Sequence, residues 1–279
     1  MGLTKYNLKP LILWILLLLV VIWSTFPVCY AVISSFKMPK DIYRYPPTFI
    51  PHTFTFNNFV DLFNNWTVFP RAIFNSIVIS LGSIVLTVII SMFAAFSFSR
   101  FSSKFLRRSA FFIIAIRMFP PIIISIPLYP ILSRLNLADS HLVLIVLYTV
   151  FQVTIMTWIF KVFFDNIPKE IEEAALIDGC SPFESFYKII IPLARPSIVT
   201  VSILVGIYTW NEYMFAFLFV STNAKTTPLL ISEMMGALTG IAWGQVFAAS
   251  FIQMVPVLIF VLLAQRFLVK GVMTGAFKG

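Results

Sequence analysis

The sequence predicts an all-α polytopic membrane protein with six transmembrane helices and both termini in the cytoplasm. Hydrophobic residues make up 59% of its 279 residues, and charged residues only 11%. The apolar residues are grouped in runs of about 20, the length that crosses the hydrocarbon core of a bilayer. Basic residues gather at the ends of alternate runs, which is typical of cytoplasmic loops. We therefore expect one transmembrane domain over residues 1–279.

The first apolar run covers about residues 11–33 and follows Lys5 and Lys9. A basic flank before an apolar core also occurs in secretory signals. This run is long enough to span and has no convincing small-residue cleavage site. We interpret it as a retained first helix with its N-terminus in the cytoplasm.

A proline-rich and aromatic loop at 34–70 precedes the second span, expected at about 71–98. Four basic residues follow this span without an accompanying acid, and they are Arg100, Lys104, Arg107 and Arg108. A short loop with this composition is the clearest cytoplasmic marker in the chain.

The third span, at about 109–133, contains Pro120, Pro121, Pro127 and Pro130. Each proline removes a backbone donor, so a straight helix is not expected. Such breaks are tolerated at membrane depth where the backbone is buried in protein or faces water.

The remaining spans are expected at about 141–164, 196–220 and 245–269, and a polar loop at 165–195 separates the first two. That loop carries six of the chain's eleven acids: Asp165, Glu170, Glu172, Glu173, Asp178 and Glu184. A segment this polar cannot lie in hydrocarbon. The distribution of basic residues between alternate loops places it on the cytoplasmic side.

The polar loop is expected to form two short helices at an angle. Pro168 suits a first helical turn, and acids follow where the helix dipole favours negative charge. Gly179 is placed to end the first helix in a left-handed cap. Ser181, Pro182 and Glu184 form a capping box that starts the second helix, and Pro192 and Pro196 mark where that helix gives way to the next span.

Several functions are excluded or weakened by the sequence. The net charge of +9 comes from residues at the ends of apolar runs, so no nucleic-acid partner is expected. Cys29 and Cys180 lie in different settings and predict no disulfide, and His52 and His141 form no metal-ligand cluster. No phosphate-binding loop is present, so the chain should not hydrolyse ATP by itself.

The polar loop contains a spaced motif: Glu173-Ala174-Ala175, three further residues, Gly179, nine further residues, and then Ile189-Ile190-Ile191-Pro192. This motif resembles the EAA loop of ABC-importer permeases. The stretches FKMPKDIYRYPP, FPPIIISIPLYPIL, TWNEYMFAFLF and TTPL extend the likeness over most of the chain. They resemble the carbohydrate-uptake branch, typified by the second membrane subunit of maltose importers.

This resemblance implies a non-catalytic subunit of a binding-protein-dependent, ATP-driven importer in a prokaryotic inner membrane. The partners it implies are a second permease in a heterodimer, an ATPase dimer, an extracytoplasmic substrate-binding protein and membrane lipid. ATP and Mg would be bound by the ATPases, with no cofactor on this chain. The substrate would be a sugar or oligosaccharide, moved by alternating access.

The same resemblance implies which residues dock onto the ATPase. Glu173 would supply polar contacts, Ala174 and Ala175 would permit close approach, and Gly179 would set the angle between the two helices. Asp178 would cap the helix or contact the ATPase, and Pro192 would close the motif.

Two charged residues fall well inside predicted spans, away from the span ends: Arg117 in the third and Glu212 in the fifth. Charges there are costly and usually face a cavity or a partner. With Trp210 and Asn211 they are candidates for the translocation pathway, since aromatic stacking and hydrogen bonding suit a sugar. The alternative is structural, with Glu212 satisfying backbone groups freed by a kink. A depth difference of ~12 Å argues against an Arg117–Glu212 ion pair.

Other functions stay open at this point. A polyol or glycerol-phosphate importer would favour basic groups along the pathway, for which Arg117 is the strong candidate. A stand-alone secondary transporter would need ion-coupling carboxylates within its spans, and Glu212 is the sole acid there. A membrane enzyme would need a cluster of reactive side chains, which the sequence does not offer.

Overall fold

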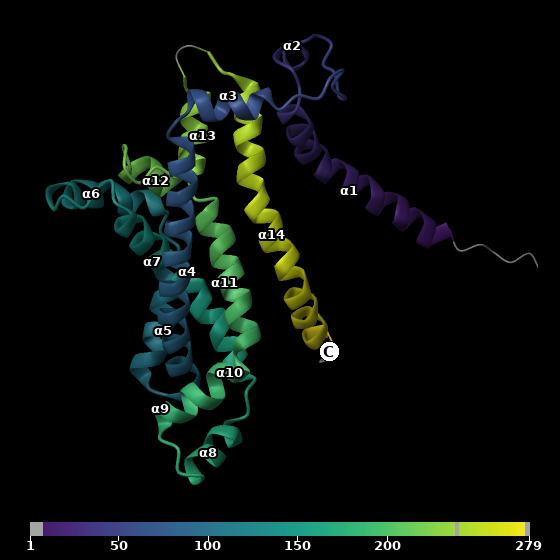
Figure 1. Ribbon diagram of the computed structural model, residues 1–279. Coiled ribbons are helices and arrows are strands. Elements are labelled where there is room, and N and C mark those ends of the chain that lie inside the picture. The colour runs from purple at the N-terminus through teal and green to yellow at the C-terminus, as the bar shows by residue number, and fades with distance from the viewer. Residues whose placement is uncertain (1–7, 238–239, 277–279) are drawn as a thin grey trace, which may run out of the picture. The chain divides into compact units, whose positions relative to one another are not determined.

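The computed structural model describes residues 8–237 and 240–276, and every regular element in these ranges is a helix (Figure 1). Four helices are long and apolar enough to cross a membrane, and six spans result if each of two bent pairs counts as one. This agrees with the predicted all-α polytopic class. The four are α1 (Leu8–Ser35), α4 (Phe69–Arg100), α7 (His141–Asp165) and α14 (Trp243–Ala276).

The third predicted span is a broken one, as its prolines indicated. Helix α5 (Lys104–Ile116) and helix α6 (Pro121–Arg134) meet at 90° across a short break. Pro120 is the N-cap of α6 and Pro121 occupies its first turn, where a missing backbone N–H costs nothing. Pro127 and Pro130 lie inside α6 and leave it helical.

The fifth apolar run is interrupted where the sequence predicted continuity to residue 220. Helix α11 (Arg195–Trp210) ends before Asn211, and the short helix α12 (Met214–Phe219) begins after Tyr213. No proline or glycine marks this break, and its signal is the polar pair Asn211-Glu212. A second bend, of 71°, lies between the stretch 182–193 and α11.

The chain divides into two compact units. The first comprises Met1–Phe69 with Ile231–Met254, and the second comprises Pro70–Leu230 with Val255–Gly279. Residues 1–7 and 277–279, whose cytoplasmic side was predicted, lie outside the described residues, so the side of the termini stays a prediction.

The first unit contains α1, α2 (Pro39–Ile42), α3 (Asn57–Asn65), the end of α13 (Thr227–Met235) and the start of α14. The ring of Phe36 contacts those of Phe59 and Phe251, with centroids 5.2 and 5.7 Å away. Asn58 Nδ2 donates to the carbonyls of Ser35 and Lys37 at 2.9 and 2.7 Å, which fixes the end of α1. Aromatic contacts and one buried amide thus hold this unit together.

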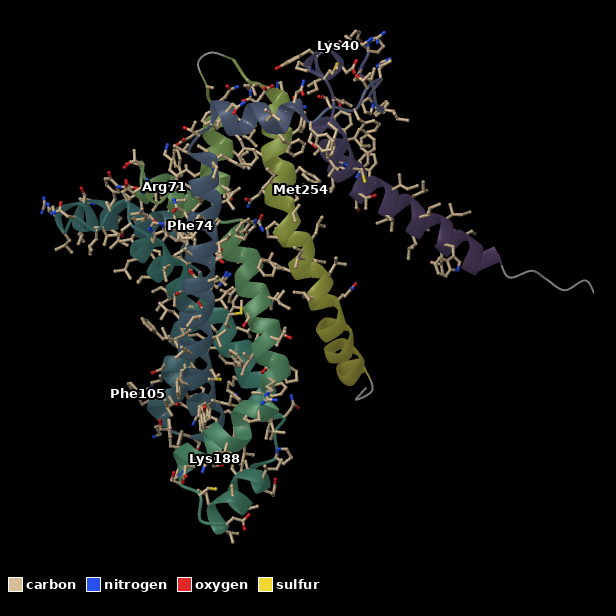
Figure 2. All side chains as sticks on the ribbon, in the orientation of Figure 1. Lys40, Arg71, Phe74, Phe105, Lys188 and Met254 are labelled. Atoms are coloured by element: carbon tan, nitrogen blue, oxygen red, sulfur yellow. The ribbon has the colours of Figure 1, made fainter. Side chains whose placement is uncertain are left out.

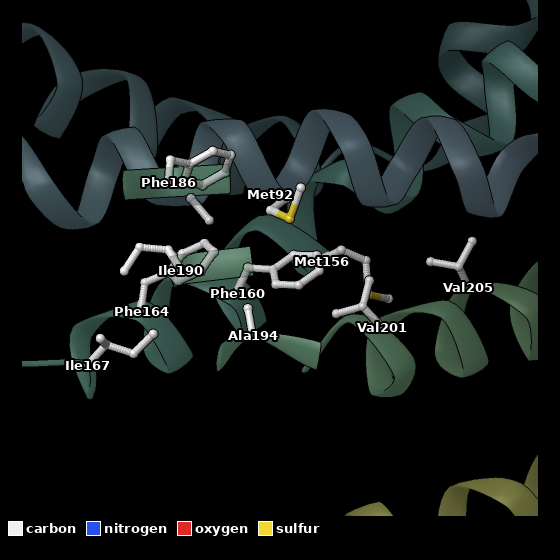
Figure 3. Close-up of a cluster of buried hydrophobic side chains, with 11 residues drawn as sticks. Met92, Met156, Phe160, Phe164, Ile167, Phe186, Ile190, Ala194, Val201 and Val205 are labelled. Carbon is white, nitrogen blue, oxygen red and sulfur yellow. The ribbon is translucent and has the colours of Figure 1, made fainter. Parts of the chain in front are cut away.

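The second unit is built on α4, α7 and α11, which run side by side (Figure 1). Two apolar clusters fill it. One joins α7 to α12, through residues such as Tyr148 and Phe215. The other continues from α4, α7 and α11 into the polar loop (Figure 3), and its buried members are Met92, Ala95, Met156, Phe160, Phe164, Ile167, Phe186, Ile190, Ala194, Val201 and Val205.

Candidate functional site

The first helix of the polar loop is α8 (Lys169–Ile177), and Pro168 is its N-cap. Glu170 and Glu172 lie in its first turn, where the partial positive charge of the helix end stabilises carboxylates. The predicted stop is confirmed, because Gly179 has a φ of +88°. The N–H of Gly179 donates to Leu176 O at 3.1 Å and that of Cys180 to Ala175 O at 3.0 Å. This pair of bonds is a Schellman cap.

A side chain at Gly179 would meet no atom within 4 Å of its Cβ. Glycine is therefore required here by the backbone conformation and not by crowding. A β-branched residue at positive φ is strained by about 1–2 kcal/mol. The turn between the two helices depends on this one residue.

The second helix begins at the predicted capping box. Ser181 Oγ accepts from Glu184 N at 3.2 Å, and Glu184 Oε2 accepts from Ser181 N at 3.0 Å. The chain then passes through α9 (Pro182–Ser185), the π-helix η1 (Phe186–Ile190) and α10 (Ile191–Leu193). The wider π turn just before Pro192 accommodates a residue that cannot donate to the helix ladder. The bend into α11 lies at Ala194, between the two prolines that predicted it.

The residues of the EAA-like motif divide between two faces of α8. Ala175 is 5% exposed and faces the protein's own interior. Glu173, Ala174 and Asp178 are exposed. Ile177 is 84% exposed at the tip of the loop, an unusual position for a large aliphatic side chain in water.

More apolar side chains are exposed on the same loop, among them Leu176, Phe183 and Tyr187. Exposed apolar side chains that gather on one surface are typical of sites that contact another protein or a membrane. The loop therefore has both the charged and the apolar groups that a docking element needs.

The opposite side of the loop is fixed to the spans. The ring of Phe186 packs on Phe96 of α4 with centroids 4.6 Å apart, and Phe96 in turn contacts Phe164 of α7 at 5.8 Å. Ile190 and Ala194 are fully buried in the same cluster (Figure 3). A displacement of the loop must consequently move α4, α7 and α11, because a close-packed core does not compress.

Arg100, at the end of α4, adds a polar connection that sequence reasoning missed. Its Nε donates to Glu172 Oε1 of α8, its Nη1 to Phe164 O at 3.0 Å and its Nη2 to Ile167 O at 3.3 Å. The side chain is only 8% exposed. In the sequence Arg100 is one of four clustered basic residues, and nothing local distinguishes it from the others.

The pathway candidates of the fifth run separate into buried and exposed residues. Trp210 and Glu212 are buried, at 4% and 9% exposure. Glu212 Oε1 accepts from Phe215 N at 2.9 Å, so this carboxylate caps the start of α12. Asn211 is exposed, and its Nδ2 donates to Ile207 O at 2.7 Å. This geometry favours the structural alternative for Glu212.

Arg117 is exposed at the end of α5. Its Nη1 donates to Phe151 O at 3.1 Å and to Thr154 Oγ1 at 3.4 Å, and it lines a cavity of about 140 Å³ with Phe151 and Tyr208. Arg117 forms no ion pair with Glu212 within residues 8–237 and 240–276. This agrees with the depth difference expected from the sequence.

Asp139 forms a second polar connection that the sequence did not reveal. It lies in the turn between α6 and α7 with a φ of +57°. Its carboxylate accepts from Asn223 N at 2.9 Å, Thr222 Oγ1 at 2.8 Å and Ser221 Oγ at 3.0 Å. Partial burial raises the pKa of this carboxyl, but the hydrogen bonds from residues 222–224 outweigh burial and hold the pKa well below its ordinary value.

Comparison with protein families places residues 87–274 in the family described as binding-protein-dependent transport system inner membrane component. The matched segment includes the whole polar loop and most of the second unit.

Similar proteins are known from several organisms. The trehalose/maltose transport system permease protein MalG of Thermococcus litoralis is 33% identical, over 98% of each chain. The sulfoquinovosyl glycerol transport system permease protein SmoH of Agrobacterium fabrum is 32% identical, over 91% of this chain and 89% of its own. A chain from the crystal structure of a bacterial ABC transporter involved in the import of alginate has the same fold, with a TM-score of 0.79 at 20% identity, over 95% of this chain and 98% of that one.

Proposed function

Because the chain belongs to the family of binding-protein-dependent transport system inner membrane components, we propose that it is the permease subunit of an ATP-driven importer of a sugar or oligosaccharide. Members of this family are multi-pass inner-membrane proteins, and the apolar helices of this chain fit that location. The permease does not hydrolyse ATP itself. It forms half of the translocation pathway, and a second permease forms the other half.

The polar loop is the observation that carries this proposal. Helix α8 exposes Glu173, Ala174, Asp178 and Ile177 on one side. Its other side is bound to the spans through Ala175, Glu172 and the cluster around Phe186. A helix that is exposed on one face and rigidly attached on the other can transmit the movement of a partner into the membrane.

ATP and Mg are bound by the two partner ATPases in this proposal. Closure of the ATPase dimer moves α8, and the rigid attachment rotates α4, α7 and α11 between two arrangements, which is alternating access. Gly179 and Pro192 act by fixing the angle between the two loop helices and the bend into α11. An extracytoplasmic binding protein delivers the substrate, as the family description indicates.

The substrate class is supported by the named substrates of the two relatives, trehalose or maltose and sulfoquinovosyl glycerol. Asn211 and Arg117 are exposed polar residues on the membrane-spanning part and are the pathway residues we propose. Trp210 and Glu212 are buried on either side of Asn211 in the sequence. We propose that they position Asn211 and the break between α11 and α12.

The function is tested by copurification of the chain with its partners from native membranes. The associated binding protein is identified and screened against mono- and oligosaccharides, polyols and glycerol phosphates. Reconstituted complexes should accumulate the bound sugar only with ATP and the binding protein present. Uptake by the isolated chain along an ion gradient would contradict the proposal.

A further inference from the structure

A cavity of about 510 Å³ lies where the start of α5 faces the end of α7. Four basic residues line it, and no acid does. The residues that give it its polar character are Arg100, Arg107, Lys161, Lys169, Ser102 and Ser103. A hollow with this lining is electrostatically suited to an anion.

Two of the four cations are already neutralised. Arg100 binds Glu172, and Lys161 Nζ lies 2.6 Å from Asp165 Oδ2. Arg107 and Lys169 have no ion pair within the described part of the chain. The cavity therefore carries two positive charges that the protein's own acids do not balance.

The start of α5 increases this imbalance. Its first turn contains no acid, although the N-terminal end of a helix favours negative charge. Lys104 occupies this turn instead and is opposed by the helix dipole, and Arg107 and Arg108 follow directly after it. An anion bound beside Arg107 would offset both the side-chain charges and the dipole.

A second, apolar cavity continues from the first. It has about 590 Å³ and shares Ile114 and Trp158 with the basic cavity. The rest of its lining comprises the aliphatic Ile155, Ile159 and Val162 of α7, together with Thr154 and Arg117. These last two are bonded to each other, because Arg117 Nη1 donates to Thr154 Oγ1 at 3.4 Å. Between Arg107 and Ile114 the helix rises by about 10 Å, so the charged level is followed by an apolar groove into the membrane.

We propose that the two cavities together bind one anionic phospholipid, with its phosphate at Arg107 and Lys169 and an acyl chain in the groove between α5 and α7. Basic pockets between membrane helices at the cytoplasmic side bind acidic head groups in this way. A soluble phosphate would leave the apolar groove empty. Trp158 lies at the junction, and its indole Nε1 is a buried donor without a partner in the described residues.

The surroundings fit contact with lipid. Phe105 is 77% and Phe111 74% exposed on α5, and Figure 2 shows the Phe105 ring projecting away from the neighbouring helices. Large apolar side chains exposed on one surface are typical of a region that contacts a membrane or another protein. The site would hold α5 at a fixed depth while the attached loop moves.

The test uses the intact transporter complex in nanodiscs of either phosphatidylglycerol or phosphatidylcholine, released for native mass spectrometry. The wild type should retain phosphatidylglycerol preferentially. Arg107→Gln with Lys169→Gln should lower its affinity for that lipid by about tenfold. Arg108→Gln removes a neighbouring charge that does not line the cavity, and it should bind as the wild type does.

The groove is tested separately with Val162→Trp, which fills it, against Val150→Trp on an exposed part of the same helix. Lipid retention should fall in the first variant and not in the second. Equal retention of both lipids, unchanged binding in the Arg107/Lys169 variant, or displacement of the lipid by inorganic phosphate alone would overturn the proposal. So would a photo-crosslink from Val162 to the second permease in place of lipid.

Discussion

The guanidinium of Arg100 binds the carboxylate of Glu172, so the last residue of α4 holds helix α8 across 72 positions of sequence. Both side chains are largely buried, at 8% and 17% exposure. The same guanidinium reaches the carbonyls of Phe164 and Ile167 at the end of α7. One side chain thus joins two spans to the loop that we propose as the ATPase-docking element.

Replacing Arg100 should weaken the coupling of ATP hydrolysis to transport. Arg100→Gln leaves Glu172 without its charged donor, and loss of a hydrogen bond between charged groups costs about 2 kcal/mol. Sugar uptake per ATP hydrolysed should fall several-fold in proteoliposomes. Glu172→Gln should have a smaller effect, because the two carbonyl contacts of Arg100 survive. Arg108→Gln, a matched basic residue on α5, should leave coupling at the wild-type level.

The polar loop at 165–195 shows which features of a site can be predicted from the sequence. Gly179 and the Ser181/Glu184 box were predicted because caps depend on residues one to three positions apart. The Arg100–Glu172 pair was not, because its partners meet only through the tertiary fold. The π turn before Pro192 was missed as well, since proline signals a helix break and not the way the chain accommodates it.

Gly179→Val should uncouple the transporter by misaligning α8. The substitution meets no neighbour, so its cost of about 1–2 kcal/mol comes from the positive φ alone. Gly179→Asn is the matched control, because asparagine tolerates this conformation. Binding-protein-stimulated ATPase activity should drop in the valine variant and be largely retained in the asparagine variant. Wild-type uptake and stimulation in Gly179→Val would refute the role of this turn.

Glu212 should contribute to the stability of the complex by capping the start of α12. Glu212→Ala removes the acceptor for Phe215 N, and loss of a helix cap costs about 1 kcal/mol. The melting temperature of the purified complex should fall, whereas Glu212→Gln, which keeps an acceptor oxygen, should lie close to the wild type. A complex of unchanged stability and altered substrate affinity in both variants would instead make Glu212 a pathway residue.

Asp139 should make the local stability of the segment 221–224 dependent on pH. Its pKa is lower in the folded than in the unfolded protein, so its contribution is present above the ordinary aspartate pKa of about 4 and fades as the pH falls further. Asp139→Asn should therefore increase amide exchange of residues 221–224 at pH 7. Asparagine adopts the same positive φ, so the variant isolates the charge.

The difference between Asp139→Asn and wild type should shrink as the pH is lowered below about 4. Asp61→Asn, at an exposed position of α3, is the control and should leave the exchange of this segment unchanged. A difference that stays constant from pH 7 to the acid range would mean that charge is not what holds the segment.

The membrane spans also show that local features are predictable from the sequence, whereas features held by tertiary contacts are not. Apolar runs and the prolines at 120 and 121 gave the membrane helices and the break in the third span, because both depend on local composition. The break after Trp210 was not predicted, since it is held by Glu212 bonding to Phe215 and by packing on α7. The role of Asp139 appears only when distant segments are brought together, whereas the structural role of Glu212 is a bond over three positions that the sequence offered as one alternative.

If the loop from Asp165 to Arg195 docks onto the ATPase, as we propose, crosslinking will detect the contact. Ile177→Cys, at the exposed tip of α8, would be introduced with Cys29→Ala and Cys180→Ala, and Phe54→Cys would be the exposed control in the loop after α1. A thiol-to-amine crosslinker applied to the intact complex should join position 177, and not 54, to the ATPase, with an efficiency that changes on ATP binding. Crosslinking of position 177 to the binding protein, or to no subunit, would contradict docking of this loop onto the ATPase.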